Sequence, residues 1–576
     1  MLTTTNTYIN ITSLHMSSMS FSPSTYVSAK VEAFVLHIAS QHLPFVPKLY
    51  LDVTDLNALA TLALVAEAKK LHPEAIGEIV AARIKPDDST YSSLIKEYCE
   101  SLGVKYVQLD ITEDVEREAT IMSNTIRVQS VTDKLYRDKT RGILYYVAKS
   151  TKGMVLTCLN KSDREIGNFS KSSDRVGDWN LIGDITNMQV RELSRHFGIS
   201  SVFIDAQERI DYDFEQKFNV TYRYINTKDG EVAEKRRYDA VIVKNLHKHR
   251  YPYNLDAKLP NGRSVLDDDG IDQTVMYTTP FPMHPELTTL LGALRTTDPF
   301  RTEEWITEKV VLFFEYLKKY NIQAVTLLVS GGVDSACVLG LAKECKKRYG
   351  LPKKIILVAV PISSTSTVQN RAYENCTAQG LPCYTVDLTE SHEILCAKVS
   401  GAFGFERSRY ADGCFRSSMR APVGYYVSRI NSCFVGQANG IVLGTGNRSE
   451  DGKPNEPSMG FFTKDGDGLV DLQLIADLYK ADVYKVAQKL GTIRPILEAL
   501  PTADLGMDQN TDEGELGFSY DTVELCIRLS QLSEEDQSAT LARLSEEAKM
   551  AYDVLFEKIT RVHKMNAHKF EMPLYI

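Results

Sequence analysis

The second half of the chain alternates short apolar runs with amphipathic segments, as strands alternating with helices do. Residues 324–329 form a mostly apolar run, A-V-T-L-L-V, and residues 335–349 follow with the spacing of an amphipathic helix. Further strands are expected at 354–360 and 383–387, on either side of a helix at 371–379. This alternation predicts an α/β fold with a doubly wound, mostly parallel sheet, in which ligands bind at the carboxyl ends of the strands.

The loop between the first of these strands and its helix reads V-S-G-G-V-D-S, which suits an anion. Gly331 and Gly332 allow backbone torsions that a side chain would block, so consecutive N–H groups can point at one phosphate. The first turn of the helix adds unpaired N–H groups and the positive end of its dipole. Ser330 and Ser335 add hydroxyl donors, and Asp334 offers a carboxylate to a magnesium ion. The loop therefore predicts a site for pyrophosphate.

This loop lacks the spacing and the lysine of the Walker A sequence. It resembles instead the PP-loop of the ATP pyrophosphatases, which activate a substrate oxygen on the α-phosphate of ATP and release pyrophosphate. NAD synthetase, GMP synthetase, asparagine synthetase and some tRNA-modifying enzymes share the loop. It therefore predicts adenylation, and the identity of the acceptor has to come from the rest of the chain.

Five further segments follow in a fixed order and narrow the resemblance to one family. They lie at 441–450, 460–471, 474–484, 501–505 and 511–520. Together with the loop they resemble NAD synthetase, over about residues 300–576. The resemblance implies a Rossmann-like PP-loop fold and a carbon–nitrogen ligase. Such an enzyme amidates deamido-NAD to NAD with ATP and Mg²⁺, through an adenylated nicotinate, and releases AMP and pyrophosphate.

The resemblance also implies roles for individual residues. ATP would be bound by Ser330, Gly331, Gly332, Asp334, Ser335, Val360, Arg420, Thr445, Lys480 and Thr502. Deamido-NAD would be bound by Arg416, Arg420, Tyr425, Asp467 and Asp471. Catalysis would rest on Asp334, Lys480, Asp467 and Asp471, with the last two orienting or deprotonating the incoming ammonium. The structural alternatives are a solvated helix charge for Lys480 and turn-capping roles for the two aspartates.

The second magnesium ligand is ambiguous because residues are inserted next to it. Asp334 and one glutamate would hold the ion. Counting forward from the preceding strand selects Glu450, and counting back from Gly460 selects Glu456. An internal repeat pairs Glu450 with Asp163, which favours Glu450.

The arginine segment of the family is also altered. It reads F-R-S-S-M-R here, in which Arg420 matches the second arginine of the pattern and Ser418 takes the place of the first. Arg416 would reach the same phosphates. Substrate binding therefore rests on fewer matching residues than ATP binding.

Residues 27–255 repeat the layout of the second half. Residues 154–163 match 441–450, and residues 169–198 run without gaps against 462–491. Both copies also end on similar His-Lys tails. We therefore predict a tandem duplication of one fold.

The first copy lacks the residues that phosphate binding requires. The phosphate loop falls on V-T-D-L-N-A at 53–58, which has neither glycine nor serine. Its Asp55 would push a carboxylate towards the phosphates, and Lys480 falls on Asn187. The first copy is therefore expected not to bind MgATP.

The degenerate first half would still have a structural role if it retains the dimer interface of the family. The resemblance implies a twofold dimer with substrate along the interface, and such an interface uses the same surface on both partners. We predict a covalent pseudo-dimer with one working site, with a regulatory or scaffolding first half as the alternative. The expected organisation is a flexible tail at 1–26, a degenerate domain at 27–255, a connector at 256–296 and an intact domain at 297–576.

Composition limits the partners and the compartment. A chain of 576 residues is too long for one core, so two or more domains are expected. The net charge of −9 argues against a nucleic-acid partner, and no apolar stretch has the length of a membrane span. The ten cysteines show no zinc spacing and predict reduced thiols in the cytoplasm.

The nitrogen donor and two rival functions complete the expectations. Glutamine-dependent relatives have a nitrilase-like amidase domain, which nothing before residue 300 resembles, so ammonia or a separate glutaminase partner would supply the nitrogen. One rival is a PP-loop ligase with another acceptor. The other is a non-catalytic nucleotide sensor or scaffold, against which the intact Asp334, Lys480 and Thr502 argue. Self-association of the fused chain is compatible with the synthetase and with both rival functions.

Overall fold

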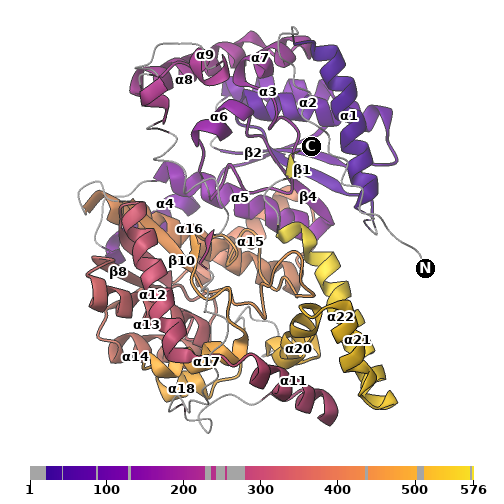
Figure 1. Ribbon diagram of the computed structural model, residues 1–576. Coiled ribbons are helices and arrows are strands. Elements are labelled where there is room, and N and C mark those ends of the chain that lie inside the picture. Colours follow the sequence, from indigo (N-terminus) through magenta and orange to yellow (C-terminus); the bar gives the residue numbers. More distant parts are fainter. Residues whose placement is uncertain are drawn as a thin grey trace.

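Each half of the chain forms one parallel sheet with helices on both faces (Figure 1). The computed structural model describes residues 21–41, 43, 45–85, 89–126, 132–170, 172–218, 220–227, 235–239, 241, 253–255, 271, 279–434, 439–502, 511–570 and 574–575.

The two sheets are six-stranded and have the same topology, with orders β12-β5-β4-β1-β2-β3 and β6-β11-β10-β7-β8-β9. All their neighbouring strands pair in parallel. The strands are β1 (Lys48–Asp52), β2 (Ile79–Ile84), β3 (Lys105–Leu109), β4 (Gly153–Thr157), β5 (Trp179–Asn180), β6 (Tyr253–Asn254), β7 (Ile322–Leu328), β8 (Lys354–Ala359), β9 (Cys383–Thr385), β10 (Asn439–Gly444), β11 (Leu472–Gln473) and β12 (Leu574–Tyr575). The prediction of two doubly wound parallel α/β domains in tandem is confirmed.

The helices of the first half precede, connect and follow its strands. They are α1 (Pro23–Ser40), α2 (Leu56–Leu71), α3 (Ser89–Ser101), α4 (Thr112–Ile126), α5 (Thr132–Thr151), α6 (Lys161–Ile166), α7 (Asn187–His196), α8 (Ser201–Phe218) and α9 (Tyr222–Thr227). Helix α1 begins at Pro23, because proline is favoured in the first turn of a helix. The tail expected at 1–26 therefore ends earlier than expected, and residues 1–20 lie outside the described part.

The second half repeats this arrangement and adds a helical carboxyl-terminal segment. Its helices are α11 (Pro285–Thr297), α12 (Thr302–Lys319), α13 (Val333–Tyr349), α14 (Ser366–Ala378), α15 (Thr389–Phe403), α16 (Arg409–Phe434), α17 (Lys480–Lys489), α18 (Arg494–Leu497), α19 (Asp512–Leu516), α20 (Tyr520–Ser530), α21 (Glu534–Ala542) and α22 (Glu546–Asn566). Helix α11 begins inside the expected connector 256–296, ends one residue beyond it and packs on α20 and α22. Much of the connector, including 256–270, lies outside the described residues.

The halves exchange their last strands. Strand β6, which ends the first half, pairs with β11 of the second half. Strand β12, which ends the second half, pairs with β5 of the first half. Figure 1 accordingly shows the carboxyl terminus among the strands of the first half. Each sheet is therefore completed by the other half of the chain.

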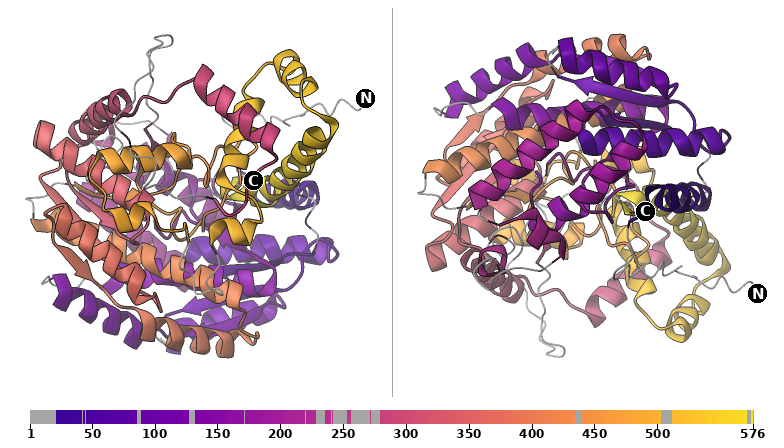
Figure 2. Two further views of the ribbon diagram at one scale, coloured as in Figure 1. Left: turned by 90° about the horizontal axis from the view of Figure 1, so that it is seen from below. Right: turned by 90° about the horizontal axis from the view of Figure 1, so that it is seen from above.

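A hydrophobic core continues from one half into the other. Helices α5 and α16 pack on each other, and both views of Figure 2 show purple helices of the first half alongside orange helices of the second. The Tyr146 ring stacks on Phe415 with a centroid distance of 4.6 Å, and its hydroxyl donates to Asp412 Oδ1 at 2.6 Å. Lys398 pairs with the buried Asp114 across the same contact at 2.8 Å. Such packing resembles a domain interior more than a contact between independent domains.

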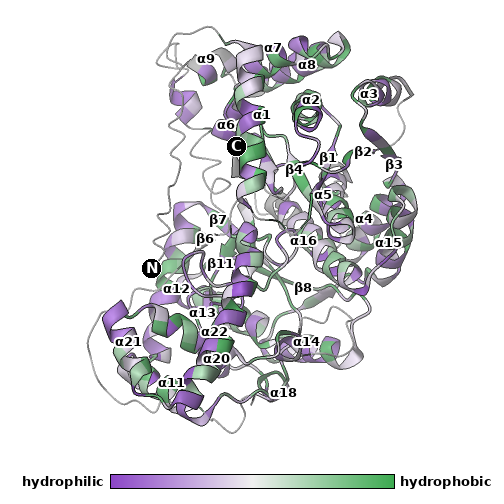
Figure 3. Ribbon diagram, turned by 90° about the vertical axis from the view of Figure 1, so that its right-hand side faces the viewer, coloured by the Kyte–Doolittle hydropathy of each residue, from purple (hydrophilic) through white to green (hydrophobic). Residues whose placement is uncertain are grey.

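Polar and apolar residues are distributed as expected for helices around buried sheets. In Figure 3 strands such as β4 and β8 are green, whereas peripheral helices such as α3 and α21 show much purple. Among the described residues, no helix combines the length and hydrophobicity that crossing a bilayer requires.

Candidate active site

The phosphate loop predicted from the sequence joins β7 to α13. Gly331 has a φ of +78°, and a Cβ on it would lie 2.4 Å from the Val368 carbonyl oxygen, so any side chain there would force the loop or α14 to shift. Gly332 is the N-cap of α13 and has no side chain to cap it, which leaves the N–H groups of the first turn facing any ligand at the loop. The Ser330 and Ser335 hydroxyls lie 3.3 Å apart at the base of the loop. This geometry is that of an anion cradle at a helix N-terminus.

Lys480 lies between two carboxylates next to this loop. Its Nζ is 2.7 Å from Asp334 Oδ2 and 2.6 Å from Glu450 Oε1, and its side chain is 5% exposed. As the first residue of α17, the lysine opposes the dipole of its own helix. The two carboxylates offset that cost. This burial excludes the alternative of a solvated helix charge.

A ring of hydrogen bonds fixes the two carboxylates. The Asn447 amide donates to Asp334 Oδ1 at 2.8 Å. The Tyr520 hydroxyl lies 2.9 Å from both Glu450 Oε1 and Asp512 Oδ2. Sequence reasoning assigned no role to the asparagine, the tyrosine or Asp512. All three lie in segments that carry the family resemblance, which was the signal available.

Burial and charge act in opposite directions on the titrating groups. Burial would lower the pKa of Lys480, but Asp334 and Glu450 outweigh it and raise that pKa well above its usual value. Burial raises the pKa of Glu450 to about 7, although the lysine opposes the shift. The lysine therefore stays charged, and a cation bound beside Glu450 would favour the ionised form of that carboxyl.

The donor set at Asp334 and Glu450 fits magnesium. Mg²⁺ prefers oxygen ligands and is commonly bound by one or two carboxylates together with substrate phosphates. Among the described residues no group of three or more His, Cys, Asp or Glu side chains could hold a metal alone. Asp334 and Glu450 would supply the carboxylates for such an ion, and a phosphate in the neighbouring cradle would supply the substrate oxygens.

Glu456 is held elsewhere. The Arg448 guanidinium binds its carboxylate through both Nε, at 3.1 Å, and Nη2. The Gln531 amide lies 3.4 Å from Glu456 Oε1. Of the two candidate metal ligands, the structure places Glu450 beside Asp334.

Two predicted ligands meet at the carboxyl end of β8. The Arg420 Nε donates to the Val360 carbonyl at 3.2 Å. Arg416 lies one helical turn earlier on α16, and its Nε and Nη1 are buried without a hydrogen-bond partner among the described residues. A buried guanidinium with unused donors suits a ligand with anionic oxygens.

The remaining predicted ATP ligands, Thr445 and Thr502, lie in segments that follow β10 and α18. Thr445 is half-buried directly after β10. Thr502 is exposed and follows Pro501, whose carbonyl accepts from the Asp512 N–H at 3.1 Å. Thr502 is thus linked to the Tyr520 network by sequence neighbours.

The two predicted carboxylates of the nicotinate end occupy different settings. Asp467 is exposed on a turn, where its Oδ1 accepts from the Thr463 N–H at 3.0 Å and the Ser417 hydroxyl at 2.7 Å. Asp471 is buried and binds the β10 backbone through the Val442 N–H at 2.9 Å. Asp467 therefore caps a turn and also faces solvent, whereas Asp471 ties the turn to the sheet.

Tyr425 lies deeper than the other predicted substrate ligands. It is 5% exposed on α16, within the core shared by the two halves. The Arg429 guanidinium lies 5.6 Å above its ring. The structure thus places this predicted ligand at the contact between the halves.

The model of the family described as NAD synthase matches residues 63–246 and 306–573, which together exceed half of the chain. The chain belongs to the NAD synthase family. Membership makes it a ligase of NAD biosynthesis, as the sequence predicted. The two matched ranges agree with a tandem arrangement.

Curated relatives of the family correspond to less than half of this chain. An NH3-dependent NAD(+) synthetase from Alkaliphilus oremlandii is 30% identical over 276 residues, 47% of this chain and 92% of the relative. One from Carboxydothermus hydrogenoformans is 32% identical over 219 residues, 38% of this chain and 82% of the relative. The chain thus contains about twice the length of such a relative.

Among solved structures, an NMN synthetase from Francisella tularensis aligns over 48% of this chain and 99% of its own, with 23% identity and a TM-score of 0.37. An NH3-dependent NAD synthetase from Campylobacter jejuni aligns over 48% of this chain and 100% of its own, with 20% identity and a TM-score of 0.35.

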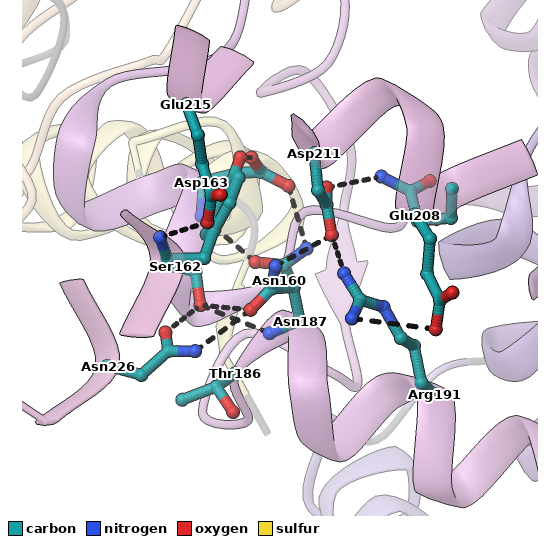
Figure 4. Close-up of polar contacts among 12 residues, drawn as sticks. Asn160, Ser162, Asp163, Thr186, Asn187, Arg191, Glu208, Asp211, Glu215 and Asn226 are labelled. Carbon is teal, nitrogen blue, oxygen red and sulfur yellow. Dashed lines mark hydrogen bonds and ion pairs between the residues drawn. The ribbon is translucent and has the colours of Figure 1, made fainter. Parts of the chain in front are cut away.

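The first half of this NAD synthase family member keeps part of the hydrogen-bond network of the site but has neutral residues at two of its charged positions; Figure 4 shows this network around Asp163 and Asn187. The Tyr222 hydroxyl donates to Asp163 at 2.9 Å, as Tyr520 donates to Glu450 in the second half. The Asn160 amide donates to Asn57 at 3.3 Å, as Asn447 donates to Asp334. Asn57 stands where the second half has Asp334, and Asn187 where it has Lys480. This site therefore lacks the buried ammonium of the second half.

Asp55 occupies the first half's anion cradle itself. It is the N-cap of α2, at the position of Gly332, and its Oδ1 accepts from the Ala58 N–H at 2.8 Å. Burial raises the pKa of this carboxyl, and the backbone hydrogen bonds oppose the shift. The N–H groups that would face a phosphate thus already have an acceptor.

Proposed function

We propose that the chain is an ammonia-dependent NAD synthetase with one active site, in its second half. Family membership gives the class of reaction. The proposal rests on one observation, the buried Asp334–Lys480–Glu450 cluster beside the glycine cradle of α13. It joins a cation, an anion cradle and two carboxylates, which is what handling MgATP requires.

The reaction would proceed in two balanced steps. A nicotinate carboxylate oxygen of deamido-NAD bonds to the α-phosphorus of ATP, and pyrophosphate leaves. Ammonia then bonds to the acyl carbon, AMP leaves with the carboxylate oxygen, and one proton is released. The loop N–H groups and Lys480 stabilise the leaving pyrophosphate, and much of the remaining acceleration comes from positioning.

Asp334 and Glu450 would hold the magnesium ion next to Lys480. When bound, the ion supplies charge neutralisation to the phosphate oxygens. The Asn447 and Tyr520 hydrogen bonds keep both carboxylates oriented before substrate arrives. Arg420, which is bound to the Val360 carbonyl at the end of β8, would contact the nucleotide.

The nicotinate end would lie near the contact between the halves. The exposed Asp467 carboxylate would orient ammonium and accept its proton. Asp471 would keep that turn fixed on β10. The buried donors of Arg416 and the ring of Tyr425 would contact the dinucleotide.

The first half would act as a non-catalytic pseudo-subunit. The exchanged strands β6 and β12 and the core shared by α5 and α16 support this role. Its neutral Asn57 and Asn187, with Asp55 in the cradle, argue against MgATP binding there. The proposed domain limits remain those expected from the sequence, except that the first domain includes all of α1.

Ammonia is the proposed nitrogen donor, as the names of the curated relatives state for those proteins. The nine described cysteines are all free thiols, which supports a reducing, cytoplasmic compartment. A net charge of −9 supports a function without nucleic acid. Self-association of the fused chain would be measured separately.

The test is formation of NAD and AMP by the purified chain from MgATP, ammonium and deamido-NAD. Asp334→Asn should abolish both products, and Asn57→Ala, at the equivalent position of the first half, should keep both. Glutamine in place of ammonium should give no NAD. Pyrophosphate release with another acceptor alone would indicate a different ligase, and nucleotide binding without turnover would indicate a sensor.

A further inference from the structure

The helices at the contact between the halves are equivalent by sequence. Helix α5 contains Tyr145-Tyr146-Val147, and α16 contains Tyr425-Tyr426-Val427 at the corresponding place. Lys149 and Arg429 each follow two residues after the valine. The two cations are therefore related by the internal repeat, and each one crosses to the other half.

Each cation binds a fully buried carboxylate of the opposite half. Lys149 Nζ lies 3.0 Å from Asp465 Oδ1, and the two side chains are 22% and 1% exposed. Arg429 Nη1 lies 2.6 Å from Asp138 Oδ2, and these side chains are 25% and 1% exposed. The two ion pairs are closely matched in distance and burial.

A serine completes each pair, with carboxylate and hydroxyl in exchanged places. Ser418 on α16 donates to Asp465 on the turn at 2.5 Å. In the equivalent network Asp138 lies on α5, and Ser172 on the turn donates to it at 2.7 Å. One network therefore ends on a turn of the second half and the other on a turn of the first half.

The turn held by Lys149 is the one that presents Asp467. Residues 463–468 lie on α16, where Gly466 approaches so closely that a Cβ would be 2.2 Å from Ser417 Oγ. Ser417 also accepts from the Asp467 N–H at 3.1 Å and donates to its carboxylate. Asp465 and Asp467 of this turn are thus hydrogen-bonded to two adjacent serines of α16, Ser418 and Ser417. A movement of Asp465 would therefore also displace Asp467.

Other charged groups pack around this contact. Lys464 lies 3.7 Å from Asp178 of the first half. Burial and then the charge of Lys149 lower the pKa of Lys569 to about 8. Lys149 therefore sits among several cations, and without it the buried Asp465 carboxylate would lose its cross-half partner, which is strongly unfavourable for a buried charge.

We propose that Lys149, a residue of the non-catalytic half, is a positioning residue of the active site. Through Asp465 it sets the place of the turn at 463–468, and hence of Asp467 at the nicotinate end of deamido-NAD. The inference rests on the proposed function and adds a part played by the first half. The Arg429–Asp138 pair holds the halves together in the same way without touching that turn.

The experiment compares Lys149→Met and Asp465→Asn with Asp138→Asn in the full chain. Loss of either ion pair should lower Tm by a similar amount. Lys149→Met and Asp465→Asn should raise the KM for deamido-NAD by roughly tenfold or more, the loss typical of removing a supporting partner. Asp138→Asn should keep that KM, because Arg429 is also held over the Tyr425 ring by hydrogen bonds to Ser170 and Ser172. The KM for ATP should stay near wild type in all three, and Lys149→Arg should restore the wild-type value.

The outcomes separate the inference from the proposed function. Equal KM values for deamido-NAD in the Asp465→Asn and Asp138→Asn chains, with equal losses of Tm, would overturn the positioning role while leaving the synthetase intact. A wild-type chain that makes no NAD would instead overturn the proposed function. If Lys149→Met does not fold, Asp465→Asn, which keeps the size of the side chain, gives the same comparison.

Discussion

At the scale of single residues, Glu450 and Glu456 differ in what their carboxylates already bind. Glu450 shares Lys480 with Asp334 and accepts from Tyr520. Glu456 is bound by Arg448 through two nitrogens. The Glu450 carboxylate, beside Asp334 and the phosphate loop, can therefore bind an ion together with substrate phosphates. The Glu456 carboxylate is already occupied by its ion pair with Arg448.

This difference predicts unequal effects of the same substitution. Glu450→Gln should lower kcat by roughly 100-fold, the order of loss seen when a group that stabilises developing charge is removed. Glu456→Gln should leave kcat near wild type and reduce Tm, because it breaks a partly buried pair with Arg448. Steady-state kinetics at saturating substrates, with Tm from calorimetry, measures both. A larger kcat loss in Glu456→Gln would assign the metal to that residue.

Sequence reasoning could reach the first of these clusters because its parts are local motifs. The phosphate loop lies within seven consecutive letters, and the repeat pointed to Glu450. The Lys149–Asp465 pair could not be found that way, since 316 positions separate its members, and the motif that contains Asp465 does not indicate a partner in the first half. Long-range pairs of this kind follow from packing of two helices, which periodicity does not reveal.

At the scale of elements, the loop before α13 is held by the helix that follows the next strand. Gly331 adopts a left-handed φ of +78° directly against the Val368 carbonyl, near the start of α14. Helix α14 begins at Ser366, earlier than the 371 expected from hydrophobic spacing, because the Thr365 hydroxyl caps it. The capping turn brings Val368 against the loop.

The glycines at the two ends of α13, Gly331 and Gly350, yield a prediction that separates the cost of a left-handed backbone conformation from the cost of a steric contact. Gly350 has a similar φ of +71°, but nothing would lie within 4 Å of its added Cβ. Gly350→Ala should therefore cost about 1 kcal/mol of unfolding free energy, from the left-handed conformation alone. Gly331→Ala should cost about 2–3 kcal/mol more, because the loop or α14 must shift. Chemical denaturation measures both, and equal costs would show that the Val368 contact yields without strain.

At the scale of the whole molecule, the boundary in sequence is not the boundary in space. The strands β6 and β12 are two residues long, too short for hydrophobic alternation to register. Sequence reasoning noticed their neighbourhood as matching tails and could not predict where they pair. The sheets predicted for the halves were correct in class, and the edge strand of each came from the other half.

Removing residues 574–576 should therefore affect the half farthest away in sequence. Strand β5 would become an edge, so amide hydrogen exchange at Trp179 and Asn180 should accelerate while the amides of β11 keep their protection. Hydrogen exchange read by mass spectrometry on the shortened and full chains tests this. Faster exchange in β11 instead would mean that the strands are not exchanged.

In the two interface networks, the carboxylate and the serine hydroxyl occupy opposite positions: Asp138 and Ser172 in one, Ser418 and Asp465 in the other. This arrangement requires two partners with different sequences. In a dimer of identical chains both networks would be the same, and Asp138 could not differ from Ser418. If the two halves were separate chains, each would also form dimers with itself. Selection for those dimers would oppose the sequence differences between the two interface networks. A covalent link fixes the ratio of the two copies and raises their local concentration for one another. The worn copy could then adapt its surface to a single partner, without remaining complementary to itself.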